Sequence, residues 1–129
     1  AGIVAYAPLT DATDAVDRTP YVKTDLVIGA GAIEKLRELY CPDEDYTNPG
    51  ISPYYGNYEG FPPLRLVWDS GEALCPDNVK FSKKVQESGV YLEAKQWNNT
   101  FHTFEILAKL LPEAKQEINS SIAFINKFL

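Results

Sequence analysis

Short apolar segments alternate with helix-forming segments along this chain, and this alternation limits the folds available to it. Three apolar segments occur, at residues 2–9, 64–68 and 90–97. The first is an almost unbroken apolar run, which is typical of a strand buried on both faces of a parallel sheet. Apolar residues at helical spacing predict helices at 32–40, at about 78–88 and on either side of Pro112. The order of these elements predicts an α/β fold with three mostly parallel strands and flanking helices.

Local signals mark the ends and faces of these elements. Asp77 is placed to cap the start of the second helix, and Gly89 is placed to end it. The third strand alternates apolar and charged residues, which indicates a half-solvated strand near a sheet edge. In the last helix, apolar residues form a stripe that we expect to face the core: Ala114, Ile118, Ile122, Ile125 and Leu129.

A long excursion, residues 10–63, separates the first two strands. Its first part, 10–28, is rich in Asp and Thr, and its last part, 42–63, holds most of the prolines and many tyrosines. So much Pro, Gly and Asn disfavours regular structure, whereas the tyrosines provide apolar surface for packing. Loops of this length in a domain are usually functional or disordered. The aromatic content favours an ordered, packed loop.

The sheet predicted from this chain is thin, and its first strand has an apolar edge. An unpaired edge of this kind calls for a neighbouring strand. The chain also contains no Met and enters its first apolar run directly after Ala1. We therefore expect a processed product whose sheet is completed by a partner chain, with residues 1–129 forming one portion of a single domain.

Composition excludes some classes of function. The formal net charge is −6 and is spread along the chain, which disfavours nucleic-acid binding. Three lysines, Lys80, Lys83 and Lys84, share one predicted helical face, where plain solvation is the simplest interpretation. No segment approaches the roughly 20 apolar residues of a membrane span.

Cysteine and histidine usage predicts no metal and no organic cofactor. Cys41 and Cys75 fit neither a metal motif nor a CxxC pair, and both a disulfide and free thiols remain open. With a single histidine in the chain, the set of metal ligands is poor. Two glycosylation-type triplets, beginning at Asn98 and Asn119, weakly favour secretion.

Titratable side chains follow the second and third predicted strands. Asp69 and Glu72 come after the second, and His102, the chain's single histidine, comes after the third. Ligand sites of parallel sheets gather at the carboxyl ends of strands. An acid beside a histidine would supply two of the three members of a nucleophile–base–acid triad. On spacing alone, an ordinary polar turn is the more common interpretation.

Longer motifs add to this pattern, and most of them fall between residues 62 and 102. They are Pro62-Pro63, Glu72-Ala73-Leu74, Asp77, Gly89, Trp97 and Phe101-His102. Upstream segments read AGIVAYAPLTDAT and NPGISPYYGNYEGFPP. In this order the chain resembles the closing part of the hormone-sensitive-lipase group of α/β-hydrolases. The resemblance implies the C-terminal part of an α/β-hydrolase fold.

This resemblance also implies catalytic roles. His102 corresponds to the general base and Glu72 to the acid, although the group commonly has Asp there and Asp69 remains a rival. Leu74 and Phe101, beside the acid and the base, are candidate substrate contacts, and packing of the site loops is an equal alternative. The group's HGGG-type and GxSxG motifs are absent from this sequence. The nucleophilic serine and the oxyanion hole are therefore expected on an N-terminal companion chain.

The implied function is that of a serine carboxylesterase or lipase acting on a small ester, as part of a two-chain enzyme. A binding protein is the alternative, because plant gibberellin receptors resemble the same group and bind a small ligand without hydrolysing it. Those receptors have lost the histidine, whereas His102 is present here. A third hypothesis is a non-catalytic proteolytic fragment.

Overall fold

Three parallel strands form the centre of the computed structural model, which describes residues 1–129. They are β1 (Ile3–Tyr6), β2 (Leu64–Asp69) and β3 (Leu92–Trp97), in the order β1-β2-β3. In this register Ile3 lies level with Leu64, and Leu64 lies level with Leu92. The predicted parallel sheet is confirmed, with strand bounds that differ by up to three residues.

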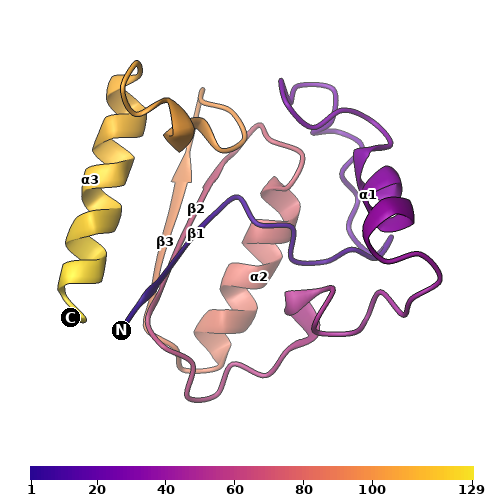
Figure 1. Cartoon of the computed structure of the whole chain (residues 1–129), viewed down its shortest axis with the longest axis horizontal. Helices are drawn as coiled ribbons and strands as arrows, with labels where there is room; N and C mark the ends of the chain where they lie inside the picture. Colours follow the sequence, from indigo (N-terminus) through magenta and orange to yellow (C-terminus); the bar gives the residue numbers. More distant parts are fainter.

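Helices cover both faces of the sheet. The α-helices are α1 (Ala32–Tyr40), α2 (Cys75–Glu87) and α3 (Pro112–Asn126), and the 3-10 turns are η1 (Pro53–Tyr55) and η2 (Phe104–Leu107). Figure 1 shows α3 on one face of the sheet, α2 on the other, and α1 farther out beyond α2. The predicted helix at 32–40 is confirmed. The first of the two closing helices is only a short 3-10 turn.

The start of α2 differs from the prediction, whereas its end agrees with it. Leu74 is the N-cap residue and makes no capping hydrogen bond through its side chain. Asp77 lies inside the first turn, where its carboxylate binds Arg18 of the excursion. Gly89 follows the helix with φ of +77°, as expected for a glycine that ends a helix.

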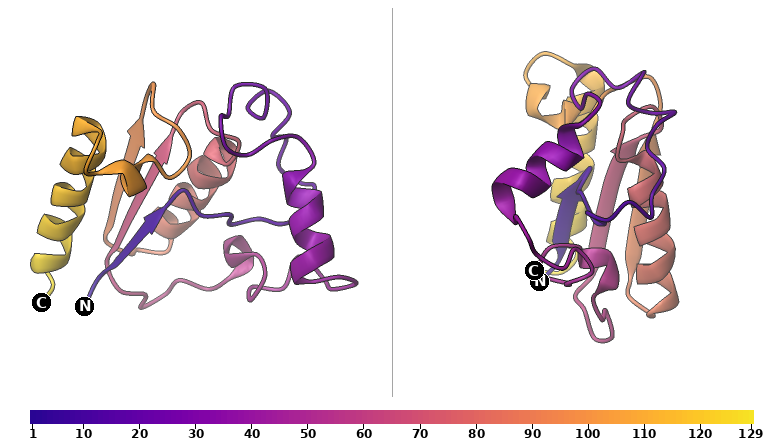
Figure 2. Two further views of the ribbon diagram at one scale, coloured as in Figure 1. Left: turned by 45° about the horizontal axis from the view of Figure 1, so that its top comes forward. Right: turned by 90° about the vertical axis from the view of Figure 1, so that its right-hand side faces the viewer.

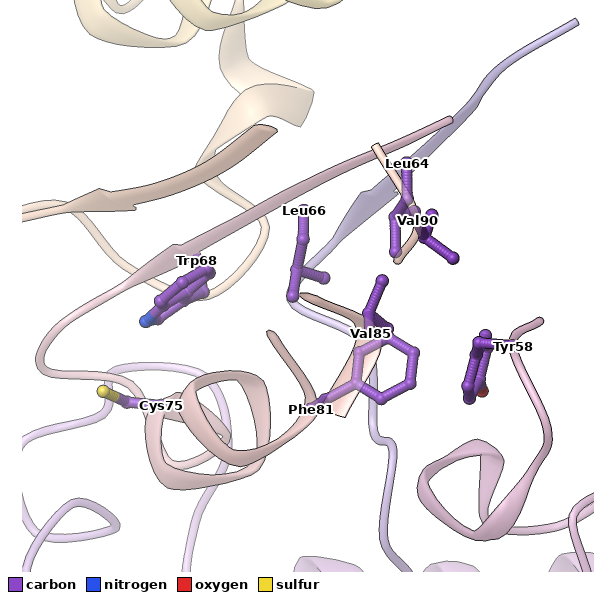
Figure 3. Packing of buried hydrophobic residues seen from close by; sticks show 8 residues of the cluster. All are labelled: Tyr58, Leu64, Leu66, Trp68, Cys75, Phe81, Val85 and Val90. Carbon is purple, nitrogen blue, oxygen red and sulfur yellow. The ribbon is translucent and has the colours of Figure 1, made fainter. Parts of the chain in front are cut away.

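Between β2 and α2 lies the apolar core. Leu66 and Trp68 point from β2 toward Phe81 and Val85 of α2 (Figure 3). Tyr58, from the excursion, packs edge-on against Phe81 with 5.3 Å between ring centroids. Burial of such side chains contributes roughly 1.5–3 kcal/mol each relative to exposure, so this layer supplies much of the fold's stability.

The opposite face of the sheet is polar where α3 covers it. Arg65 of β2 donates to Glu117 of α3 through Nε and one terminal nitrogen, at 2.9 and 2.7 Å. Trp97 donates to the other Glu117 oxygen at 2.8 Å. This buried network turns Glu117 toward the sheet, so of the predicted apolar stripe only Ala114 is buried. The residues of α3 that are buried are Ala114, Glu117, Ser121 and Phe124.

The three isoleucines of the stripe lie instead beside the open edge of the sheet. Ile122 is 54 % exposed, and Leu129 beyond the helix is 93 % exposed. Strand β1 pairs with β2 along one edge, and nothing in the chain pairs with its other edge. Side chains from β1 and α3 line a shallow apolar hollow of about 270 Å³ next to that edge, among them Val4, Tyr6, Ile118 and Ile125.

The excursion runs outward from the end of β1, passes through α1 and returns to the start of β2 (Figure 2). Ends of the chain lie close together, and the terminal ammonium of Ala1 donates to the carbonyl of Phe128 at 2.8 Å. Loops that follow β2 and β3 gather at the far end of the sheet (Figure 1). That end carries the candidate site.

Candidate active site

Asp69 closes β2 and braces the two loops of the site. One of its carboxylate oxygens accepts the Gly71 amide at 2.8 Å. Its other oxygen accepts both the amide and the hydroxyl of Thr100, at 3.0 and 2.6 Å. Both oxygens of Asp69 are therefore engaged in fastening the turn after β2 to the loop after β3.

Glu72, three residues later, faces the histidine. Its Oε2 lies 3.4 Å from Nδ1 of His102, and the Glu72 side chain is completely buried. The geometry falls short of a well-formed hydrogen bond, and both Glu72 oxygens and the Nδ1 atom have no other partner. Catalytic hydrogen bonds are often long in structures without substrate and shorten when it binds. Of the two candidate acids, Glu72 is the one placed beside the imidazole.

Burial determines the electrostatics of this pair. It raises the pKa of the Glu72 carboxyl, and the neighbouring imidazole of His102 partly offsets that rise. The carboxylate of Asp25 adds to the rise. In so dry a setting, a positive charge that develops on the imidazole would be stabilised more strongly than in water.

The loop that carries His102 has an unusual backbone. Asn99 and Thr103, on either side of the histidine, have φ of +62° and +52°. Non-glycine residues rarely adopt this left-handed conformation, which costs on the order of 1 kcal/mol or more per residue. Phe104 offsets this cost, because its buried ring packs edge-on against Trp97 with 5.5 Å between centroids. The loop is thus held by packing at its base while the imidazole stays 16 % exposed.

The two candidate substrate contacts lie in different surroundings. Leu74 is buried at the start of α2. Phe101 is half-buried and, with Glu72, lines a cavity of about 170 Å³. This cavity lies between the turn of residues 70–73, here called the acid turn, and the excursion. In this chain Phe101 is therefore the better placed of the two to reach a bound molecule.

A contact that the sequence did not reveal joins the excursion to the acid turn. Asp25 accepts the Ala73 amide at 2.6 Å, and the hydroxyl of Thr24 donates to the Gly71 carbonyl at 3.1 Å. Nothing in the local sequence distinguishes Asp25 from the other acidic residues of the excursion. Ala73, its partner in the turn after β2, is 48 residues away along the chain.

Glu105 is a second buried acid that the sequence did not single out. It lies in η2, close after the histidine, and one of its oxygens has no hydrogen-bond partner. Burial raises the pKa of this carboxyl to about 7, and the carboxylates of Glu117 and Glu72 add to the rise. Its position between apolar Phe104 and Ile106 gave no sign of a special role.

The cysteines, possible metal ligands and helix lengths were also considered in the sequence, and the structure describes each of them. Cys41 and Cys75 are both buried free thiols, so they form no disulfide. No cluster of three or more His, Cys, Asp or Glu side chains is arranged to hold a metal ion. None of the helices combines the length and the apolar character required to span a bilayer.

Comparison with known proteins identifies the family to which the chain belongs. Residues 1–106 match the family model described as alpha/beta hydrolase fold, and the chain belongs to this family. Within it, the chain is of the hormone-sensitive-lipase type. A hormone-sensitive lipase from a metagenome library superposes with a TM-score of 0.92 at 27 % identity, over 99 % of this chain and 44 % of that one.

Curated relatives carry hydrolase names. An acetyl-hydrolase of Streptomyces hygroscopicus is 25 % identical over 97 % of this chain and 42 % of its own length. The esterase LipU of Mycobacterium tuberculosis is 28 % identical over 98 % of this chain and 45 % of its own length. The chain therefore spans less than half the length of these relatives.

Proposed function

We propose that this chain supplies the acid and the base of a carboxylic-ester hydrolase, with Glu72 and His102 as two members of a Ser–His–Glu triad. One observation carries the proposal: a fully buried carboxylate lies 3.4 Å from the imidazole, at the carboxyl ends of adjacent parallel strands. The esterase and hydrolase names of the relatives support the same class of reaction.

In this proposal the imidazole acts first as a base and then as an acid. His102 takes the proton of a serine hydroxyl as that hydroxyl attacks the ester carbonyl. It then gives the proton to the leaving alcohol, and water later releases the acyl group by the same route. Glu72 holds the Nδ1 side of the ring and stabilises the imidazolium that forms in between. Asp69 braces the loops that carry both groups.

We propose further that the serine and the oxyanion hole come from a companion chain that pairs with the open edge of β1. Support comes from the unpaired edge and from the apolar hollow that Val4, Tyr6 and the isoleucines of α3 form beside it. A strand added there would extend the parallel sheet and bury these side chains. Residues 1–129 would then be the C-terminal portion of one domain, with the excursion as part of its pocket wall.

The catalytic roles are tested by substitution. We expect His102→Ala to lower kcat for a p-nitrophenyl ester by about 10⁴-fold or more, because triad members act as a unit. Glu72→Gln should lower kcat by about 10³- to 10⁴-fold with a smaller change in KM. Glu113→Gln, which neutralises an exposed carboxylate of α3, is the matched control and should leave kcat unchanged. If Glu72→Gln retained wild-type kcat, the triad role would be overturned.

The companion is tested by mass and by labelling. Mass spectrometry under native and denaturing conditions should show a second polypeptide that travels with this chain. A serine-directed fluorophosphonate should label that polypeptide and not this one. Stoichiometric label on this chain would overturn the placement of the nucleophile. No label on either chain would favour the non-hydrolytic binding protein, and no second chain would overturn the two-chain arrangement.

A further inference from the structure

Glu72 occupies the middle of a short turn whose two sides are both held by the excursion. On one side, the Gly71 carbonyl accepts the hydroxyl of Thr24 at 3.1 Å. On the other side, the Ala73 amide donates to Asp25 at 2.6 Å. Two consecutive excursion residues therefore bind the peptide groups immediately before and immediately after the proposed catalytic acid.

Asp25 is itself fixed in place by its second oxygen. That oxygen accepts the amides of Val27 and Ile28 at 2.7 and 2.9 Å, closing a turn in its own segment. Asp and Asn commonly form such turns. The carboxylate thus serves as a bridge, with one oxygen on its own loop and the other on the acid turn.

Such a bridge matters because the Glu72 side chain has little else to orient it. Neither of its oxygens forms a hydrogen bond with the protein apart from the 3.4 Å approach to the imidazole. A buried glutamate has three rotatable side-chain bonds, so its carboxylate position depends on where the backbone places its Cα atom. Misplacement by about 1 Å at a reacting group can cost about 100-fold in rate.

We propose that Asp25 is a positioning residue for the triad acid, acting through the Ala73 amide to set the distance between Glu72 and His102. The inference rests on the proposed function, and it gives Asp25 a role in catalysis besides its contribution to the fold. It also couples the pocket wall to the catalytic machinery, because the segment that binds the acid turn is part of the excursion. The negative charge of Asp25 also raises the pKa of the Glu72 carboxyl, an electrostatic effect separate from its positioning role.

Asp25→Asn is designed to remove the hydrogen bond to the acid turn while keeping those of the local turn. The amide oxygen of Asn can still accept from Val27 and Ile28, but the amide nitrogen then faces the Ala73 amide, where donor meets donor. We expect kcat to fall about 10- to 100-fold with KM changed by less than about threefold. The acid limb of the kcat/KM profile should move to lower pH, because loss of the Asp25 charge lowers the pKa of Glu72. Asp25→Glu keeps the charge and a second acceptor, and should recover most of kcat.

Asp45→Asn is the matched control. Asp45 closes a turn of the same kind in the same excursion, accepting the Thr47 amide at 2.9 Å, and it does not contact the acid turn. Its substitution should leave kcat and the pH profile unchanged. Equal effects of Asp45→Asn and Asp25→Asn would overturn the proposal, because the loss would then reflect only a weakened loop.

A double-mutant cycle with Glu72→Gln, measured on the protein with any companion chain that co-purifies, distinguishes positioning from general destabilisation. If Asp25 acts through Glu72, Asp25→Asn should cost almost nothing further in a Glu72→Gln background. Additive losses would overturn the inference. A wild-type rate for Glu72→Gln itself would instead overturn the proposed function, so the two failures can be told apart.

Discussion

The sheet and the excursion are held by different kinds of interaction. On the sheet side, Leu66 and Val85 are completely buried within an apolar cluster. Where the excursion meets α2, the contacts are ion pairs that involve buried carboxylates. There Arg18 forms two hydrogen bonds with the Asp77 carboxylate, at 2.8 and 2.6 Å, and Asp11 binds Lys80 at 2.9 Å.

This difference bears on how tightly each region depends on particular partners. Apolar packing tolerates many side chains of similar volume, so its cost on substitution follows the volume lost. A buried ion pair depends on both partners, because removal of one leaves a charge without compensation. The ion pairs between the excursion and α2 should therefore be more sensitive to single polar substitutions and to pH than the apolar cluster between β2 and α2.

Arg18→Met should produce the largest loss of stability. The carboxylate of Asp77 is completely buried, so removal of its partner should lower the free energy of unfolding by about 3–5 kcal/mol at pH 7.5. Burial already raises the pKa of Asp77, and Arg18 opposes that rise. Without Arg18 the pKa rises further, so the penalty is complete above that value and shrinks as the pH falls toward 4. Urea unfolding at both pH values measures the change.

Leu66→Ala provides the comparison from the sheet side. It should cost about 2–5 kcal/mol through the lost contacts and the cavity that remains, and the cost should be equal at pH 7.5 and pH 4 because no charge is involved. The contrast between the regions would be broken if the Arg18→Met loss were also independent of pH.

The sequence predicted the sheet side well because its signals are local. Apolar runs located the three strands, and Gly89 marked the end of α2. The closeness of Glu72 and His102 followed from a general rule, since loops after adjacent parallel strands meet at one edge. The family resemblance assigned the acid to Glu72 and left Asp69 as a rival, and in the structure Glu72 lies beside His102 whereas Asp69 binds Thr100.

Predictions that failed depended on distant partners. Asp77 was expected to cap α2, but it binds Arg18, 59 residues away along the chain. The isoleucine stripe of α3 was expected to face the core, but the pairing of Arg65 with Glu117 turned another face inward. For Asp25 the partner is again remote. A pattern within one segment carries no information on which distant group will meet it.

Glu105, on the sheet side, is a buried carboxyl without an ion-pair partner. Its pKa is raised by burial to about 7, well above the usual 4.5. The protonated form is therefore favoured in the fold, and the resulting stability is complete below about 4.5 and lost as the pH rises through 7. Glu105→Gln should be neutral at pH 4.5 and should raise the free energy of unfolding at pH 8 by on the order of 2 kcal/mol.

Urea midpoints at the two pH values measure this gain, with Glu113→Gln as the exposed control. An equal gain at both pH values would mean that the substitution acts through packing and not through the charge of Glu105.

Ser52→Ala should give the smallest of these effects, and it tests whether the excursion depends on single hydrogen bonds. The Ser52 hydroxyl oxygen accepts the Ala12 amide at 2.8 Å, and both residues are buried. Without the hydroxyl, a buried amide loses its acceptor, so the free energy of unfolding should fall by about 1 kcal/mol. Hydrogen exchange at the Ala12 amide should accelerate in parallel.

Ser120→Ala, which removes a hydroxyl bound to its own helix, should change the stability by less than about 0.5 kcal/mol. Equal stability of the two variants would show that the Ala12 amide finds another acceptor. The excursion would then not depend on this single hydrogen bond.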